Sequence, residues 1–150
     1  MTEETESPAD RRGAGRARPA TVSLYLLGAL GLGVTALFGG GALLVDPTGE
    51  SLRLPLEWLD GTPFSDYAVP GLVLFGVLGV GSFAVAAGVV LGRSWAWPAS
   101  VGLGVALSGW IVVQVLLVRQ VTWLQAVYGG LGLLLVGLAL TASFRAAVAR

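Results

Sequence analysis

"VSLYLLGALGLGVTALFGGGALLV", residues 22–45, is an uninterrupted uncharged stretch near the start of the chain. An α-helix rises about 1.5 Å per residue, so a helix of this length crosses a hydrocarbon core of about 30 Å. Its eight leucines each favour insertion into the bilayer by roughly 0.5 kcal/mol. A secretory signal peptide is the alternative, since arginines precede the stretch. The stretch is too long for that, however, and no small-residue cleavage site followed by polar sequence ends it.

Three further uncharged runs follow, at residues 70–92, 97–118 and 124–144. The bilayer offers the backbone no hydrogen-bond partners, so each run is expected to be helical despite its glycines. The sequence therefore predicts an all-α membrane protein, an antiparallel four-transmembrane-helix bundle with a structured extracytoplasmic loop between helices 1 and 2. The predicted parts are a disordered cytoplasmic tail (1–21), a transmembrane domain (22–144) whose outer loop is 46–69, and a second cytoplasmic tail (145–150).

The placement of arginine predicts the orientation of this bundle. All nine basic residues are arginines; seven fall in the tails and in the turn after the second run, whereas Arg53 and Arg119 lie at the opposite end. Arginine-rich segments stay in the cytoplasm, so both termini are expected there and the 46–69 loop outside. The exclusive use of arginine, with much Ala, Gly and Val, suggests a GC-rich genome and therefore the cell membrane of a prokaryote.

The composition excludes several chemistries. Without Cys or His the chain has no disulfide, no thiolate or imidazole catalysis, and no zinc or haem site built on those residues. The formal net charge is zero, so nothing favours a nucleic-acid partner. No ionisable side chain other than tyrosine lies within any span, which argues against proton-coupled transport. The glycine runs at 28–33 and 129–132 lie inside apolar spans, so they are not phosphate-binding loops, and no cofactor or metal is expected.

The predicted outer loop has ordered turn chemistry. "DPTG" at 46–49 is typical of a type I turn, and "LRLPLEWL" at 52–59 is expected to lie in the membrane interface. Thr62, followed by proline, is typical of a helix start, and Pro70 predicts a kink or break before the second span. We interpret the loop as a means of returning the chain to the membrane, with a binding lid as the alternative.

Three motifs carry a resemblance to a known family: "TPFSDYAVPG" at 62–71, "GWIVVQ" at 109–114 and "LQAVYGGLG" at 124–132. With them, the chain resembles an uncharacterised family of small four-helix prokaryotic integral membrane proteins over most of residues 46–140. The resemblance implies the architecture, and it implies no activity, cofactor or mechanism.

Polar side chains gather where the third span ends and the fourth begins. Gln114 lies near the end of the third span, and Gln125 and Tyr128 open the fourth. These spans are antiparallel neighbours, so the three side chains are expected at similar depth, with Arg119 and Asp66 just above them. We interpret this outer-face polar cluster as interhelical hydrogen bonds worth roughly 0.6 to 2 kcal/mol each. A shallow ligand or solute site is the alternative.

Small residues repeat every four positions in two of the spans. Such stripes let helix backbones approach closely, because lipid provides no hydrophobic drive for helix association. We interpret them as helix-packing faces within one chain, and alternatively as the seam of a homo-oligomer. The candidate packing residues are Ala84, Gly88 and Gly92 in the second span and Ser100, Gly104 and Ser108 in the third.

These features predict a non-catalytic accessory or scaffold protein whose surroundings are the lipid bilayer and a membrane-protein partner or second copy. One alternative is an oligomeric channel or transporter for an uncharged or weakly polar solute. A third is an intramembrane enzyme acting on a lipid or quinone, using acids and tyrosines at the outer rim. The chain is expected not to be an enzyme.

Overall fold

The computed structural model describes residues 18–119 and 121–149, so most of the predicted N-terminal tail lies outside the described residues. The regular secondary structure of the described part is helical, without strands, and four of its helices are long and apolar enough to cross a membrane. This agrees with the predicted all-α bundle and indicates a multi-pass membrane protein. The helices are α1 (Ala20–Val45), a rod of α2 (Ala68–Val73), η4 (Leu74–Val80) and α3 (Gly81–Val90), then α4 (Ala96–Val118), α5 (Trp123–Leu140) and the short α6 (Ala142–Val148).

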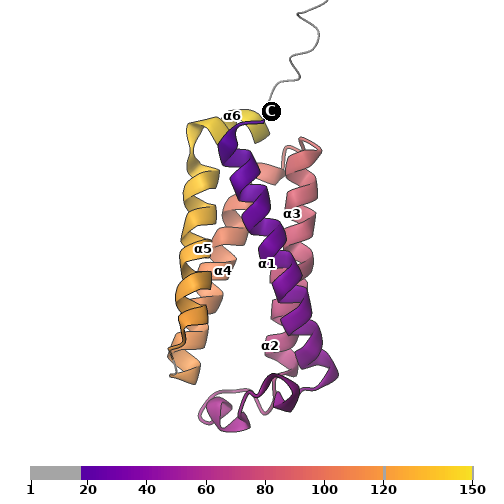
Figure 1. Ribbon diagram of the computed structural model, residues 1–150, viewed down its shortest axis with the longest axis vertical. Helices are drawn as coiled ribbons and strands as arrows, with labels where there is room; N and C mark the ends of the chain where they lie inside the picture. The colour runs from indigo at the N-terminus through magenta and orange to yellow at the C-terminus, as the bar shows by residue number, and fades with distance from the viewer. Residues whose placement is uncertain (1–17, 120, 150) are drawn as a thin grey trace, which may run out of the picture.

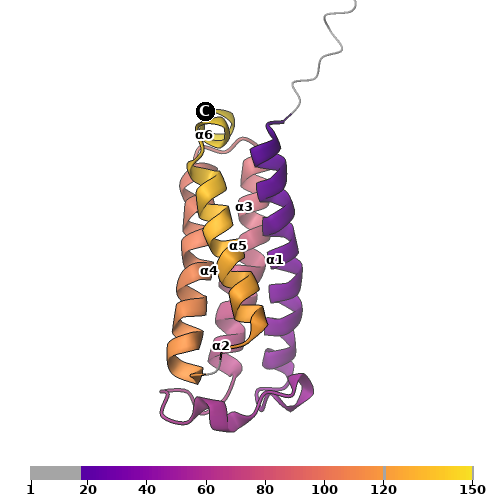
Figure 2. The same ribbon diagram turned by 60° about the vertical axis from the view of Figure 1, so that its left-hand side comes forward.

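The long helices alternate in direction and form two hairpins (Figures 1 and 2). In the first hairpin α1 packs along α2, η4 and α3, and in the second α4 packs along α5. Figure 1 shows the two hairpins close together at the end that carries α6 and spread apart at the end that carries the loop between α1 and α2. The bundle is therefore closed at its terminal end and open at its loop end.

Glycines bring the two rods of the first hairpin into backbone contact. A Cβ atom added at Gly40 would lie 2.5 Å from the backbone nitrogen of Phe75, and one added at Gly71 would lie 2.8 Å from the Cβ of Leu43. Only residues without a side chain fit such distances. Close packing of this kind replaces the hydrophobic drive that is missing in lipid.

The second hairpin uses the predicted small-residue stripe of α4. A Cβ atom at Gly104 would lie 2.9 Å from the backbone nitrogen of Val136, and one at Gly132 would lie 2.5 Å from the Oγ of Ser108. Ser100 is fully buried, and its hydroxyl donates to the carbonyl of Ala96. Ser100, Gly104 and Ser108 therefore lie in contacts within the chain.

The predicted stripe of the second span differs from the packing face that is observed. Ala84 is exposed, because α3 faces its neighbours through Ser82 and Val85. Gly92 is exposed too, and a Cβ atom there would meet nothing within 4 Å. Its left-handed backbone (φ 63°) instead ends α3, and the next N–H, that of Arg93, donates to the carbonyl of Gly88. Gly88 is buried, but against the Trp95 indole of the following turn.

Pro70 does not break the second rod, contrary to the prediction. The helix begins at Ala68, so Pro70 lies in its first turn, where backbone N–H groups have no intrahelical acceptor. The irregularity lies further on, in η4, which is a π-helix. A π-turn holds more residues than an α-turn, so the faces of α3 are rotated relative to those of α2.

Side chains from α1, α4, α5 and α6 close the terminal end of the bundle. The Tyr25 hydroxyl donates to the carbonyl of Ser100 at 2.9 Å, and the Tyr25 ring lies 4.9 Å from the ring of Phe144. The indole N–H of Trp97 donates to the carbonyl of Ala139 at 3.0 Å. This half of the bundle is consequently filled.

The fourth span is shorter than predicted, ending at Leu140 instead of residue 144. The backbone of Thr141 is extended, and its hydroxyl accepts from the N–H of Phe144, which starts α6. α6 lies across the end of the bundle (Figure 1) and buries Phe144 and Val148. The predicted tail at 145–150 is therefore helical through Val148, and residue 150 lies outside the described residues.

Candidate functional site

The loop between α1 and α2 is folded around Asp46. One carboxylate oxygen of Asp46 accepts from the Thr48 hydroxyl at 2.5 Å, and the other accepts from the Ser51 backbone N–H at 2.8 Å. These hydrogen bonds, that of Thr48 first, lower the pKa of the Asp46 carboxyl. They hold the turn that leads into two short 3-10 helices, η2 (Glu50–Leu52) and η3 (Leu56–Leu59).

Tyr67 holds the far end of the same loop. Its backbone N–H donates to the carbonyl of Pro47 at 2.8 Å and its hydroxyl donates to the carbonyl of Pro55 at 2.7 Å. The ring is buried with Leu43 and Leu59 in a small core of its own, and burial raises the pKa of Tyr67. The loop is thus an ordered unit, and its η3 segment contacts α4 of the other hairpin. It bridges the open end of the bundle.

The start of α2 differs from the predicted one. Thr62 does not cap a helix; its hydroxyl donates to the carbonyl of Leu59 at 2.7 Å within the loop. The helix begins later, where a carboxylate oxygen of Asp66 accepts from the N–H of Ala68 at 2.9 Å. Asp66 therefore supports the first turn of α2 and takes no part in a polar cluster with α4 and α5.

A cavity of about 590 Å³ lies between the two hairpins above this loop. Ligand pockets in proteins typically measure about 300 to 1,000 Å³, so the cavity has room for a small ligand or part of a larger one. Its lining is mostly apolar and comes from α1, the loop, α2, η4, α4 and α5. The lining residues include Gly39, Leu43, Arg53, Leu54, Leu74, Leu78, Leu107, Ile111, Gln114, Gln125 and Tyr128.

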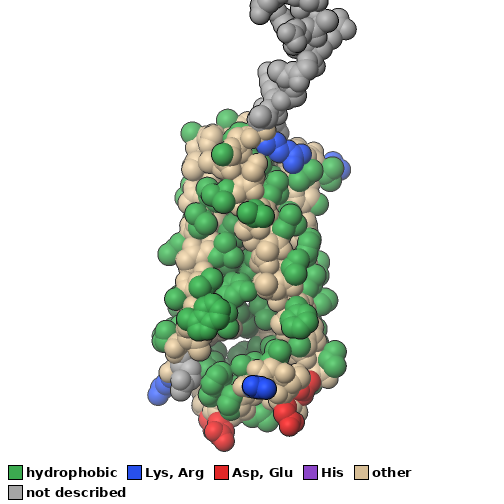
Figure 3. All heavy atoms as spheres, in the orientation of Figure 1, with side chains coloured by type: hydrophobic (Ala, Val, Ile, Leu, Met, Phe, Trp, Pro, Cys, Tyr) green, Lys and Arg blue, Asp and Glu red, His purple; other side chains and the backbone are tan. Residues whose placement is uncertain are grey.

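The cavity opens on the side of the bundle. Figure 3 shows a hollow between the two hairpins above the loop, bordered by hydrophobic side chains. On α1 the lining runs from Leu32 to Leu43, which at about 1.5 Å per residue spans roughly 17 Å, or about half of a hydrocarbon core. In a membrane crossed by these helices, the opening would face the acyl chains of one leaflet.

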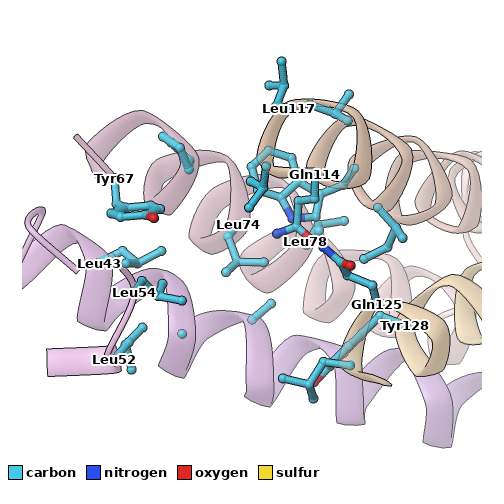
Figure 4. A pocket seen from close by; sticks show the side chains of 18 of the residues that line it. Leu43, Leu52, Leu54, Tyr67, Leu74, Leu78, Gln114, Leu117, Gln125 and Tyr128 are labelled. Atoms are coloured by element: carbon cyan, nitrogen blue, oxygen red, sulfur yellow. The ribbon is translucent and has the colours of Figure 1, made fainter. Parts of the chain in front are cut away.

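Gln114, Gln125 and Tyr128, three members of the predicted polar cluster, line the cavity. Figure 4 shows them on the α4–α5 side, across from Leu43, Leu74 and Tyr67. Among the described residues no hydrogen bond joins the three side chains, so the structure does not show them as interhelical ties. The Gln125 side-chain oxygen accepts from the backbone N–H of Thr122 at 3.0 Å, an N-terminal capping contact of α5.

The two charged residues of the predicted cluster lie elsewhere. Arg119 is exposed at the end of α4 and, like Asp66, does not line the cavity. The charged residue that does line it is Arg53, which comes from the loop. The sequence signal for Arg53 is weak, a single cation in a leucine-rich loop segment.

The lining supplies binding groups and no acid–base pair. Within the part of the chain that the structure describes, the lining contains no carboxylate, and the sequence has no histidine or cysteine. Among residues 18–119 and 121–149, no three carboxylates approach closely enough to hold a metal ion. Two amides, two phenols and one guanidinium around a mostly apolar space instead suit an amphipathic molecule, because polar groups at one end fix its orientation.

No sequence pattern distinguishes the apolar lining of the cavity from other apolar positions. Gly39, Leu74 and Leu78 are residue types that also occupy lipid-facing and core positions of these helices. No local signal therefore marks them as lining a cavity. Comparison with protein-family models, with curated proteins and with solved structures finds no match to this chain. The resemblance to a small four-helix membrane family stays a prediction, and the cavity is the structural feature that bears on function.

Proposed function

We propose that this protein is a non-catalytic accessory protein of a prokaryotic cell membrane that holds an acyl chain of a membrane lipid in its cavity. The observation that carries the proposal is the apolar cavity of about 590 Å³ that opens sideways between the hairpins. A lipid chain reaches such an opening from within the leaflet, without passing through water.

The depth of the cavity supports the same proposal. Its lining includes Leu78, near the middle of the rod of α2, η4 and α3, and Leu107, at the middle of α4, so the cavity extends about half-way along the bundle. At the other end lie Arg53, Gln114 and Gln125. A molecule with an apolar chain and a polar head matches this order of groups, with the chain directed toward the closed end of the bundle.

A channel or transporter for an uncharged solute is less well supported by the geometry. The polar lining is confined to the loop half, and the other half is filled by Tyr25, Leu135 and Phe144, all fully buried. A pore along the bundle would require these residues to separate. Solute flux into liposomes that contain only this protein would favour that alternative.

For orientation, we propose that both termini lie in the cytoplasm and the loop outside, on the strength of the arginine distribution. The chain has no cysteine, so single-cysteine variants are free of background. We expect Ser51→Cys to react with a membrane-impermeant maleimide in intact cells, and Ala149→Cys to react only after the cells are opened. Equal reactivity at the two positions would overturn this orientation.

Photolabelling tests lipid binding directly. The protein is placed in nanodiscs with a phospholipid that carries a diazirine in its acyl chain, irradiated and mapped by mass spectrometry. We expect labels on Leu74 and Ile111, which line the cavity and are half-buried. Labels confined to exposed positions would contradict the proposal.

Two glycines of α1 provide a matched pair of variants for this experiment. Gly39 lines the cavity, and a Cβ atom there would lie 3.5 Å from Leu74, an ordinary contact. Gly31 is exposed, with nothing within 4 Å of an added Cβ. We expect Gly39→Leu to fill the cavity and suppress labelling of its lining, and Gly31→Leu to leave labelling unchanged. Equal labelling in the two variants would count against the cavity as the binding site.

A further inference from the structure

The polar rim of the cavity continues into a second, shallow hollow on the loop surface. Thr48, Glu50, Glu57 and neighbouring loop residues line this hollow, and it shares Arg53 and Leu54 with the cavity. Arg53 therefore lies between a mostly apolar cavity, in which no described acidic residue takes part, and a surface hollow with two glutamates.

The Arg53 guanidinium has no partner within the described residues. It makes no hydrogen bond or ion pair there, although Glu50 and Glu57 line the same hollow. The backbone of Arg53 is left-handed (φ 55°), a conformation that carries an energetic cost for residues other than glycine. The loop holds it through the Arg53 N–H, which donates to the carbonyl of Glu50 at 2.9 Å. An accessible cation is thus kept at the rim.

We infer that this rim selects the headgroup of the bound lipid, and that the preferred ligand is a zwitterionic phospholipid. Its acyl chain lies in the cavity, its phosphate on Arg53, and its cationic amine on Glu50 and Glu57. A guanidinium presents paired N–H donors that match phosphate oxygens. The two carboxylates attract the amine and disfavour a headgroup without a positive charge.

Selectivity among lipids has to come from the headgroup, because the acyl chain contributes little to it. Acyl chains in the bilayer are as apolar as the cavity wall, so moving a chain sideways gains little hydrophobic free energy. The polar end of the cavity then decides which lipid remains bound. This inference rests on the proposed lipid binding and adds the class of headgroup.

Competition between two lipids tests the inference. The protein is exchanged into micelles with equal amounts of phosphatidylethanolamine and phosphatidylglycerol of identical chains, and bound lipid is counted by native mass spectrometry. We expect a preference of roughly two- to fivefold for phosphatidylethanolamine, the scale of an exposed charge pair. Equal occupancy by the two lipids would overturn the inference.

Variants separate the rim from general surface charge. Arg53→Gln is expected to lower the retention of both lipids, because both carry the phosphate, whereas Glu50→Gln combined with Glu57→Gln is expected to remove the preference for phosphatidylethanolamine. The matched control is Arg119→Gln, since Arg119 is also an exposed, left-handed arginine (φ 52°) but lines neither hollow. An equal effect of Arg53→Gln and Arg119→Gln would overturn the assignment to the rim.

The outcomes distinguish this inference from the proposed function. If lipid is retained without headgroup preference and Gly39→Leu still displaces it, the headgroup inference fails and lipid binding stands. If no lipid is retained and Gly39→Leu changes nothing, lipid binding itself fails. Thermal unfolding of each variant in the same micelle verifies that the protein is folded.

Discussion

The Tyr25 hydroxyl donates a hydrogen bond of 2.9 Å to the carbonyl of Ser100 and so joins α1 to α4, two helices that otherwise pack mainly against other partners. The bond lies at the terminal end, where the bundle is filled. At the loop end no comparable bond between described residues crosses the space, and the hairpins spread apart around the cavity. One end of the molecule is thus filled by side chains, and the other encloses the cavity.

We expect Tyr25→Phe to lower the free energy of unfolding by about 1 kcal/mol, because interhelical hydrogen bonds in membranes contribute on that order. The check is unfolding in mixed micelles as the fraction of denaturing detergent is raised. Tyr128→Phe is the matched control, since within the described residues the Tyr128 hydroxyl has no hydrogen-bond partner. Equal stability of the two variants would show that the Tyr25 bond contributes nothing.

Gly40→Ala should be among the most damaging single changes in the first hairpin. Its Cβ atom would lie 2.5 Å from the backbone nitrogen of Phe75, and backbone yields less readily than a side chain. Overpacking of this kind costs about 1 to 3 kcal/mol. Gly41→Ala is the control, because its Cβ atom would lie 3.7 Å from the Phe75 ring. Thermal unfolding in detergent compares them, and similar midpoints would contradict the packing described here.

Gly92→Ala tests the revised role of that glycine. The space around it is open, so a methyl group does not collide, but the left-handed backbone (φ 63°) strains an alanine. We expect a loss of about 1 kcal/mol, since a left-handed residue other than glycine costs about 1 to 2 kcal/mol. Gly102→Ala is the control, as it lies in open space without a positive φ. If the seam of an oligomer lay here, the variant would change the oligomeric state instead of the stability.

The loop should loosen in acid through Asp46. Hydrogen bonds in the folded state lower the pKa of this carboxyl, so its stabilising effect is present above the ordinary value of 3.8 and is lost as the pH falls through the lowered pKa. Deuterium exchange at the Ser51 amide should therefore accelerate, beyond its intrinsic pH dependence, as the pH drops below that ordinary value. Asp46→Asn should show fast exchange at every pH, whereas Asp60→Asn should behave as wild type. Identical profiles for all three would show that Asp46 does not hold the loop.

The helices themselves were predictable from the sequence. In lipid, an uncharged apolar segment can satisfy its backbone hydrogen bonds only as a helix. The observed helix bounds differ from the predicted ones by a few residues at most. Ser100, Gly104 and Ser108 were also found, because a stripe of small residues is a local pattern. The cap at Thr141 and the first-turn position of Pro70 were missed, since each depends on where the neighbouring helix begins.

By itself the sequence determined that four rods form and that the chain between the first two is ordered, because length, apolarity and turn residues act locally. Only the tertiary structure decided which faces meet and where they part. Gly40 and Phe75 are in contact within the first hairpin, and Tyr25 and Phe144 fill the end of the bundle that carries α6. The loop held by Tyr67 lies between the hairpins at the other end. The cavity and Arg53 at its rim result from those long-range contacts, and no stretch of sequence contains them alone.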